Sequence, residues 1–206
     1  MTITINGNGH ISGLVVGGLP NGSVNADSLA SNAVTSAKLH NDAVTSAHMP
    51  SNTIVQVVQK FKNDPESTSG NSHTAIPGLT VAITPSSSNN KVLVIISCSI
   101  NSTDAGAGVS LVRDGTEIFL GTASSSRKRY TMGGVYGGSG ENNIYSNPQS
   151  SLTFLDSPNT TSEVLYKMQT MSRGSADVSI GASTYNVDND NTSRTPSSIT
   201  LMEIKG

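Results

Sequence analysis

Most of the chain alternates short apolar runs with turn-forming residues. Thr80–Thr84 and Glu163–Gln169 alternate apolar and polar residues with a period of two, which predicts strands with one buried face. Asp114-Gly115 separates two further apolar runs and favours a two-residue hairpin turn. The predicted strands are Ile54–Phe61, Leu79–Ile83, Lys91–Ile100, Val109–Val112, Glu117–Leu120, Tyr130–Val135, Ser151–Leu155, Glu163–Met171, Val178–Ile180 and Ser198–Ile204.

These strands predict a mainly β fold. About eight to ten short strands within about 150 residues are typical of an antiparallel β-sandwich, and above all of a jelly roll. No helical pattern longer than about two turns occurs in this part of the sequence. We therefore expect residues 53–206 to fold as a jelly-roll head domain.

Residues 21–52 contain an internal repeat with a period of ten residues. Each copy has a Val, then an Asn or Thr that can cap a short helical turn, then a large aliphatic residue. A period of ten does not fit the seven-residue repeat of a coiled coil. The copies are Gly22–Leu29, Asn32–Leu39 and Asp42–Met49, and their apolar positions are Val24, Leu29, Val34, Leu39, Val44 and Met49.

The apolar positions of this repeat need neighbours. One chain cannot enclose them, whereas several parallel copies around an axis would bury one layer of Val and one layer of Leu per repeat. We therefore expect residues 21–52 to form an assembled stalk. A Ser- and Asn-rich leader without fixed structure is the alternative.

Residues 1–20 lack a pattern that could form a core. Ile3–Ile5 alternates like a short strand, and Gly7–Gly9 and Gly17–Pro20 are turn signals. We expect this segment to anchor the protein to a partner. The expected organisation is thus an anchor at 1–20, a stalk at 21–52 and a head at 53–206.

Composition excludes several functional classes. Only 13% of residues are charged and the net charge is −2, which gives no electrostatic footprint for nucleic-acid binding. No apolar run is long enough to span a membrane, and the N-terminus lacks the basic and apolar regions of a signal peptide. Cys98, the single cysteine, lies in an apolar run and is expected to be a core residue, not a reactive thiol.

The sequence offers little catalytic or metal-binding chemistry. It has no Gly-x-Ser-x-Gly nucleophile motif. Asn186–Asn191 has the oxygen donors of a calcium loop but neither its Gly nor its distal Glu. We expect no enzyme activity, no cofactor and no bound metal. The histidines are scattered among Ser and Asn without acidic partners at ligand spacing, at His10, His40, His48 and His73.

Two predicted loops carry the residues that we expect to contact a receptor. Residues 124–130 include the only basic cluster, and residues 133–145 are rich in Gly and carry two tyrosines. Tyrosine offers a large contact area at a small entropy cost, and basic side chains attract anionic surfaces. The alternative is that these loops are spacers and that the tip at 186–191 makes the contact, or none is made. The candidate residues are Arg127, Lys128, Arg129, Tyr130, Tyr136 and Tyr145.

Both the repeat and the head resemble a known family. The repeat and the leader are similar to the stalks and the start of tail fibres from tailed bacteriophages, cyanophages especially. The C-terminal half is similar to phage head domains. The segments that carry the resemblance are Ile5–Leu14, Gly17–Val24, Ala33-Val-Thr-Ser-Ala-Lys-Leu39, Ser86–Val94, Phe154–Ser162 and Arg194–Ile204.

This resemblance implies a homotrimer with jelly-roll heads similar to those of tumour necrosis factor and complement C1q. It implies a structural virion protein, a tail fibre that attaches to another virion protein through residues 1–20 and recognises a host cell-surface glycan or protein. Such a protein is made in the host cytoplasm, sits on the phage tail or capsid, and neither inserts into membranes nor binds nucleic acid. No catalytic residue and no cofactor come with the resemblance.

Two other functions fit the same sequence less well. Decoration (cement) proteins of capsids or tails can also be trimeric jelly rolls, so a cement role is the alternative. A carbohydrate depolymerase is the third hypothesis, because such tailspikes cleave glycans with paired carboxylates. Those enzymes need a large groove, usually on a β-helix, and this head looks too small for one.

Overall fold

The computed structural model describes residues 4–5, 11–12, 21–22, 24–69, 73–103, 106–136, 145, 147–172, 174 and 176–206. The chain divides into two units between Thr45 and Ser46. Residues 46–52, at the end of the predicted stalk, are therefore part of the C-terminal unit. The N-terminal unit holds two short antiparallel strands, β1 (Thr4–Ile5) and β2 (Ile11–Ser12).

The ten-residue repeat has one short 3₁₀ turn per copy. The turns are η1 (Ala26–Ser28), η2 (Ser36–Lys38) and η3 (Ser46–His48), and the last one lies in the C-terminal unit. Asn25 caps η1, because its side-chain oxygen accepts a hydrogen bond from the Ser28 amide at 2.9 Å. These turns confirm the short helical turn expected in each copy.

The repeat is also visible in the backbone dihedral angles. The first residue of each copy has a positive φ, and so does the residue ten positions after the start of the last copy: Gly22 (80°), Asn32 (64°), Asp42 (64°) and Asn52 (68°). Gly, Asn and Asp are the residues that tolerate this left-handed conformation. The ten-residue period of the sequence therefore also appears in the backbone conformation.

The apolar positions of the repeat are exposed in the single chain. About half of the surface of each of these side chains remains accessible, while Met49 is partly buried. Within a single chain, the described residues therefore do not bury these apolar side chains. The exposed positions are Val24, Leu29, Val34, Leu39 and Val44.

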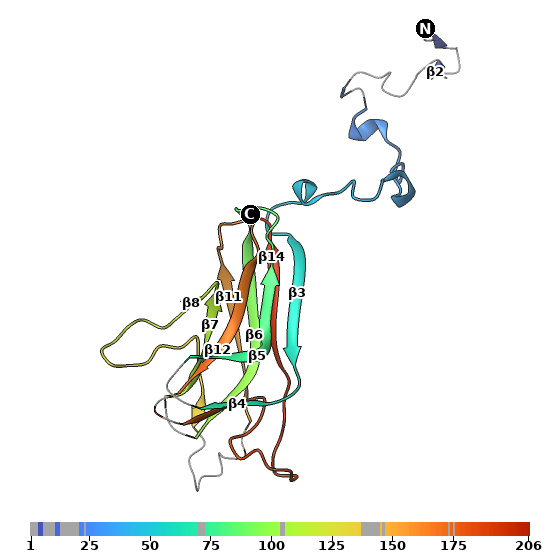
Figure 1. Ribbon diagram of the computed structural model, residues 1–206. Helices are drawn as coiled ribbons and strands as arrows, with labels where there is room; N and C mark the ends of the chain where they lie inside the picture. The colour runs from blue at the N-terminus through green and yellow to red at the C-terminus, as the bar shows by residue number, and fades with distance from the viewer. Residues whose placement is uncertain are drawn as a thin grey trace. The chain divides into compact units, whose positions relative to one another are not determined.

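Two sheets build the C-terminal unit (Figure 1). The larger sheet has the order β3-β14-β6-β13-β4, with β10 and β11 also pairing with β6, and the smaller has the order β5-β12-β7-β8, with β9 pairing with β7. All pairs are antiparallel except the short pair β10–β6. The strands are β3 (Ile54–Lys62), β4 (Glu66–Ser69), β5 (Thr74–Ile83), β6 (Lys91–Ser102), β7 (Gly108–Arg113), β8 (Thr116–Ile118), β9 (Met132–Gly133), β10 (Val135–Tyr136), β11 (Gln149–Asp156), β12 (Val164–Met171), β13 (Asp177–Ile180) and β14 (Ser197–Ile204).

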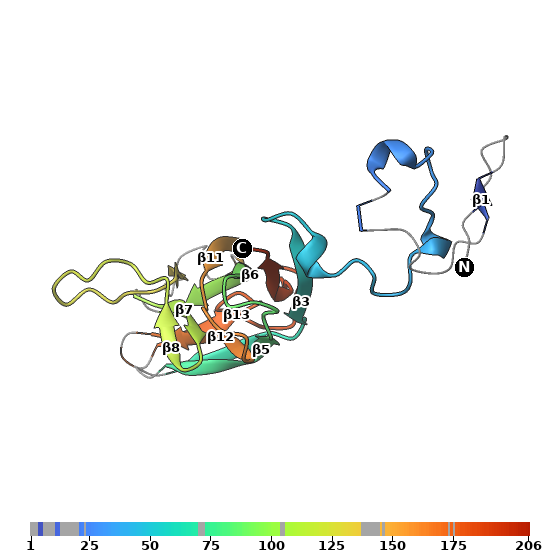
Figure 2. The same ribbon diagram turned by 90° about the horizontal axis from the view of Figure 1, so that it is seen from above.

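Buried residues of both sheets form one apolar core, and the two sheets lie in separate layers when the unit is seen from above (Figure 2). In β6, Val94, Ile96 and Cys98 are buried, whereas Leu93 and Ile95 are only partly buried on the other face. Cys98 is fully buried, and burial raises the pKa of its thiol to about 12, so it is a protonated core residue as expected. The described chain is thus mainly β and contains no α-helix, which confirms the predicted mainly β class and is consistent with a β-sandwich.

Asp156 ties the two sheets together. Its carboxylate, on β11, accepts hydrogen bonds from Arg113 Nη1 on β7 at 2.8 and 2.7 Å. It also accepts one from the Tyr166 hydroxyl on β12 at 2.6 Å. Burial and this carboxylate raise the pKa of Tyr166, so the phenol stays protonated and keeps donating. A paired and hydrogen-bonded carboxylate is the form in which a buried charge is tolerated.

The Asp114-Gly115 pair correctly predicts the hairpin that joins β7 to β8. Asp114 and Gly115 have φ values of 47° and 86°, as a two-residue turn of the predicted kind requires. Strand β4, by contrast, was not predicted. Its sequence Glu-Ser-Thr-Ser has no apolar residue, and the strand forms because its backbone pairs with β13 at the sheet edge.

We expect Gly108→Ala to destabilise the fold strongly. A Cβ atom at Gly108 would lie 2.5 Å from Cγ of Tyr130 and 2.6 Å from the backbone oxygen of Met132, and that backbone atom cannot easily move away. The cost should be about 1–3 kcal/mol, as for other overpacked positions. Gly133, which pairs with Gly108 across the sheet, has open space at its Cβ position and is the matched control. Equal denaturation midpoints for the two variants would contradict this packing.

Candidate recognition and assembly surfaces

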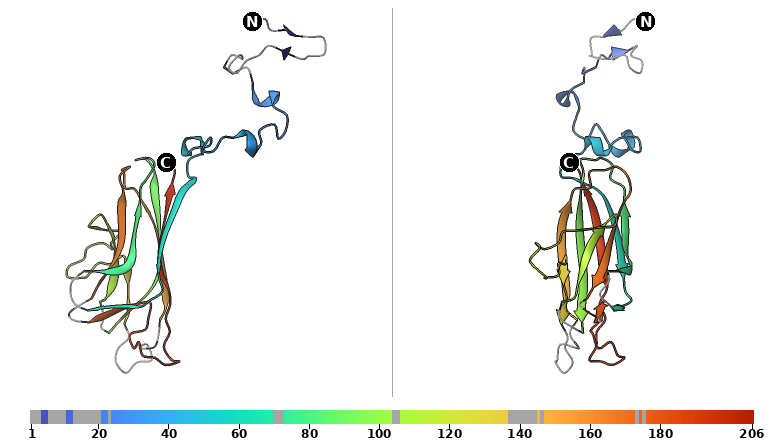
Figure 3. Two further views of the ribbon diagram at one scale, coloured as in Figure 1. Left: turned by 45° about the vertical axis from the view of Figure 1, so that its right-hand side comes forward. Right: turned by 60° about the vertical axis from the view of Figure 1, so that its left-hand side comes forward.

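Several loops gather at one end of the C-terminal unit, opposite the end that holds Gly206 and the start of β3 (Figures 1 and 3). We call the described residues 145, 147–148 and 181–196 the distal loops. They precede β11 and connect β13 to β14. Loops on a rigid β scaffold are the usual place for binding residues.

Asn101 and Asn147 hold the distal loops together. Asn101 is buried at the end of β6, and its Nδ2 donates to Asn147 Oδ1 at 3.1 Å and to the backbone oxygen of Ala182 at 2.8 Å. Asn147 in turn donates to Thr195 Oγ1 at 3.2 Å and to the Ser193 backbone oxygen at 3.3 Å. The segment before β11 is therefore fixed to the connection between β13 and β14.

The distal loops that Asn101 and Asn147 join carry two tyrosines, Tyr145 and Tyr185. The rings of Tyr145 and Tyr185 meet edge to face, with centroids 5.8 Å apart and an interplanar angle of 85°. The exposed fractions of the two residues are 39% and 48%. Perpendicular packing is a preferred geometry for aromatic pairs, and it leaves ring surface of both residues open to a ligand.

The residues that follow Tyr185 in the same loop line a polar cavity of about 470 Å³. The loop folds on itself, because Thr192 Oγ1 donates to the Val187 backbone oxygen at 2.6 Å and the Asn191 amide donates to Asn189 Oδ1 at 2.9 Å. Carboxylate, amide and guanidinium groups thus stand around one hollow. The lining residues are Val187, Asp188, Asn189, Thr192 and Arg194.

The structure divides the predicted receptor contacts between two places. Arg127, Lys128 and Arg129 are exposed in the loop between β8 and β9, which projects sideways from the smaller sheet (Figures 1 and 2). Tyr136 is exposed on β10, beside the end of β6. Tyr145 belongs to the distal loops. The basic cluster and the Tyr145–Tyr185 pair are therefore separate surfaces.

Tyr130 has a packing role in the structure. Its ring lies against Gly108, and its hydroxyl donates to the Gly106 backbone oxygen at 2.5 Å. Partial burial raises the pKa of its phenol. The side chain fastens the end of the projecting loop to β7.

Sequence reasoning missed Tyr185 and Arg194. The sequence offers the tip at 186–191 as an alternative contact, and Tyr185 directly precedes this tip. Only the fold brings this tip to Tyr145, which is 40 residues earlier in the chain. The presence of one of the few aromatic residues beside an Asn- and Asp-rich turn was the available signal.

A second surface covers the outer face of the larger sheet. Strand register places three rows of side chains side by side across β3, β14, β6 and β11. None of these side chains is charged, and the nearest charged residue along β6, Lys91, is one row further. We call this surface the outer sheet face. Its rows are Val57, Met202, Leu93 and Leu155; then Gln59, Thr200, Ile95 and Thr153; then Phe61, Ser198, Ser97 and Ser151.

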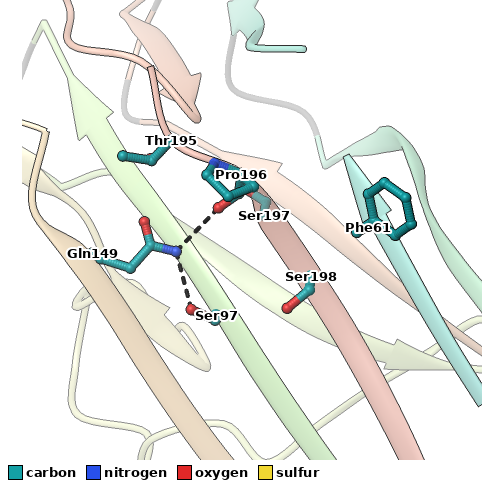
Figure 4. A pocket seen from close by; sticks show the side chains of 7 residues that line it. All are labelled: Phe61, Ser97, Gln149, Thr195, Pro196, Ser197 and Ser198. Carbon is teal, nitrogen blue, oxygen red and sulfur yellow. Dashed lines mark hydrogen bonds between the residues drawn. The ribbon is translucent and has the colours of Figure 1, made fainter. Parts of the chain in front are cut away.

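A cavity of about 530 Å³ hollows the outer sheet face at its third row (Figure 4). Phe61, 65% exposed, forms one wall. On the other side, Gln149 Nε2 donates to Ser97 Oγ at 3.0 Å and to the Pro196 backbone oxygen at 3.2 Å. The hollow is thus lined by one large aromatic ring, a proline and small hydroxyl side chains.

No group of three or more His, Cys, Asp or Glu side chains that could hold a metal ion occurs among the described residues. In the same part of the chain, no helix is long and apolar enough to cross a membrane. Neither protein-family models nor curated protein sequences match this chain.

Proposed function

We propose that the protein is the tail fibre of a tailed bacteriophage. In this proposal three chains assemble, residues 1–20 attach to another virion protein, and the C-terminal heads recognise the host cell surface. The role is binding and not catalysis. The sequence resemblance of the repeat and head to phage fibres is one support, and the surfaces of the single chain are the other.

The outer sheet face is the observation that carries the proposal. Val57, Phe61 and Leu155 are each about half exposed or more, in a patch of three rows without any charge. Exposed apolar patches of this kind mark sites of protein–protein contact. The exposed apolar positions of the decapeptide repeat are a second, independent set that assembly would bury.

The strand order supports a jelly-roll head. Within the larger sheet β3-β14-β6-β11 are four neighbouring strands, and the smaller sheet contains the four strands β5-β12-β7-β8; two sets of four strands are the arrangement of an eight-stranded jelly roll, to which β4, β9, β10 and β13 add short strands. Packing the two sheets in this way leaves the outer sheet face without a covering element among the described residues. Three such surfaces around one axis would cover each other.

Sedimentation of the full chain tests the proposal. Three chains of 21.2 kDa should give a particle of about 64 kDa at micromolar concentration. Leu39→Asp should shift the particle towards single chains, because the charge would be buried once per chain around the axis. Ser31→Asp adds the same charge at an exposed polar residue between two copies and should leave the trimer intact. A wild-type chain that sediments as a monomer would refute the assembly.

The outer sheet face also favours one second function. A cement protein would cover this face with a different virion protein, over a wide contact along the β-domain. Because cement proteins can also be trimers, the attachment region separates the two functions. A fibre should lose binding to particles that lack it when residues 1–20 are removed, whereas a cement protein should still bind through its β-domain.

A further inference from the structure

We propose that the distal loops bind an uncharged saccharide. Tyr145 and Tyr185 provide the surface on which a sugar ring stacks, and the cavity lined by Asp188, Asn189 and Arg194 receives its hydroxyl groups. This inference rests on the proposed function, because it names the chemical class that the heads recognise and the place where they do so.

The two tyrosines match the apolar side of a sugar. A pyranose ring presents a face of C–H bonds, and an aromatic ring is the side chain that covers such a face while its hydroxyl remains in contact with water. Tyr145 and Tyr185 are both exposed, although the chain has only five Tyr, three Phe and no Trp. Two of the few aromatic rings in the chain are therefore exposed at the distal loops and not buried in the core.

The cavity matches the polar side of a sugar. Neighbouring hydroxyl groups both donate and accept hydrogen bonds, so they suit a site that offers acceptors and donors together. Asp188 accepts, Arg194 donates, and the Asn189 side chain has groups of both kinds. The same loop contains two acidic residues, Asp188 and Asp190, and one basic residue, Arg194. This excess of negative charge disfavours a sulfated or phosphorylated ligand.

The site is fixed before any ligand arrives. The Asn101–Asn147–Thr195 hydrogen bonds hold the base of Tyr145 to the loop that bears Tyr185. At the base of this loop Gly181 has a φ of 76°, and a Cβ atom there would lie 2.9 Å from the Thr195 backbone oxygen. A loop held in its bound conformation loses less entropy on binding. Three weak sites in one trimer would then gain about 10²–10⁴ in avidity on a surface that displays many copies of the ligand.

Saturation-transfer NMR on the full chain tests the inference. The probes are neutral methyl glycosides with gluco, galacto, manno, fuco and N-acetylated rings, together with galactose 6-sulfate as the anionic comparison. We expect at least one neutral glycoside to bind with a dissociation constant of about 1 mM per site. Tyr185→Ala and Tyr145→Ala should each weaken that binding about tenfold or more, because each removes a stacking ring.

Matched variants separate this site from the other exposed surfaces. Tyr136→Ala removes an equally exposed tyrosine outside the distal loops, and its binding should stay within about twofold of wild type. Replacing Arg127, Lys128 and Arg129 together by alanine should likewise leave the neutral glycoside bound. Thermal unfolding of each variant confirms that it is folded before its binding is compared.

Three results would overturn the inference: none of the neutral glycosides binds, the folded Tyr145 and Tyr185 variants bind as well as wild type, or binding is confined to galactose 6-sulfate and is lost with the basic cluster. Sedimentation of the same samples keeps the two proposals apart. A trimer that binds no glycoside refutes the saccharide site and leaves the fibre assembly standing. A monomer that binds glycoside does the reverse.

Discussion

Leu155→Asp should convert the proposed trimer into single chains. Leu155 lies in the first row of the outer sheet face, beside Leu93 of β6, and is 46% exposed in the single chain. In the assembly it would be buried three times, and a carboxylate without a partner is very costly in an apolar contact. We expect the association constant to fall by about a hundredfold or more, which sedimentation at several concentrations would measure.

Leu165→Asp is the matched control for this prediction. Leu165 is 40% exposed and lies on β12 of the smaller sheet, so it offers the same change of side chain at a similar exposure on a different surface. In the proposed assembly, the trimer of this variant should be as stable as that of the unmodified chain. If both variants dissociate, or neither does, the outer sheet face is not the contact between chains.

The strands could be predicted from the sequence wherever one face of a strand is buried. The predicted strands Lys91–Ile100 and Ser198–Ile204 end within two residues of β6 and β14, because short runs rich in apolar and β-branched residues between turn residues are typical of strands. The Asp114-Gly115 turn was equally clear. Local chemistry determines both features, so one sequence is enough to find them.

Features that depend on pairing between distant segments could not be predicted in this way. Strand β4 has no apolar residue and exists only through its partner β13. The uncharged rows of the outer sheet face need the register of four strands, since a shift by one residue would turn each side chain to the other face. The meeting of Tyr145 with Tyr185 likewise follows from the order of strands in the sheets.

Glu203 is the second position at which we expect a large effect. The carboxylate lies fully buried inside the C-terminal unit and has no ion-pair partner among the described residues. Hydrogen bonds satisfy it instead: Gln56 Nε2 and Asn90 Nδ2 donate at 2.5 Å, and the Ser86 amide and hydroxyl donate at 2.7 and 2.8 Å. These bonds join β14 to β3 and to the loop before β6.

Glu203→Gln should destabilise the C-terminal unit by about 2 kcal/mol, because a side-chain amide turns an NH₂ group towards donors that need an acceptor. In a unit of this size that cost corresponds to a fall of about 4–8 °C in the unfolding temperature. Glu163→Gln makes the same change at an exposed residue beside β12 and should stay within about 0.5 kcal/mol of wild type. Calorimetry of both variants near neutral pH gives the comparison.

The same carboxylate should make stability depend on pH. Burial alone would raise the pKa of Glu203, but the hydrogen bonds from Asn90, Gln56 and Ser86 outweigh burial and lower it. A carboxylate whose pKa is lower in the folded than in the unfolded chain stabilises the fold fully above its ordinary pKa, and this contribution is lost as the pH falls towards the folded value. Glutamine does not titrate, so the difference in unfolding free energy between wild type and Glu203→Gln should be largest near pH 6 and shrink over the range below the ordinary glutamate pKa of about 4.3. A difference that stays constant over this range would show that Glu203 acts through its shape and not through its charge.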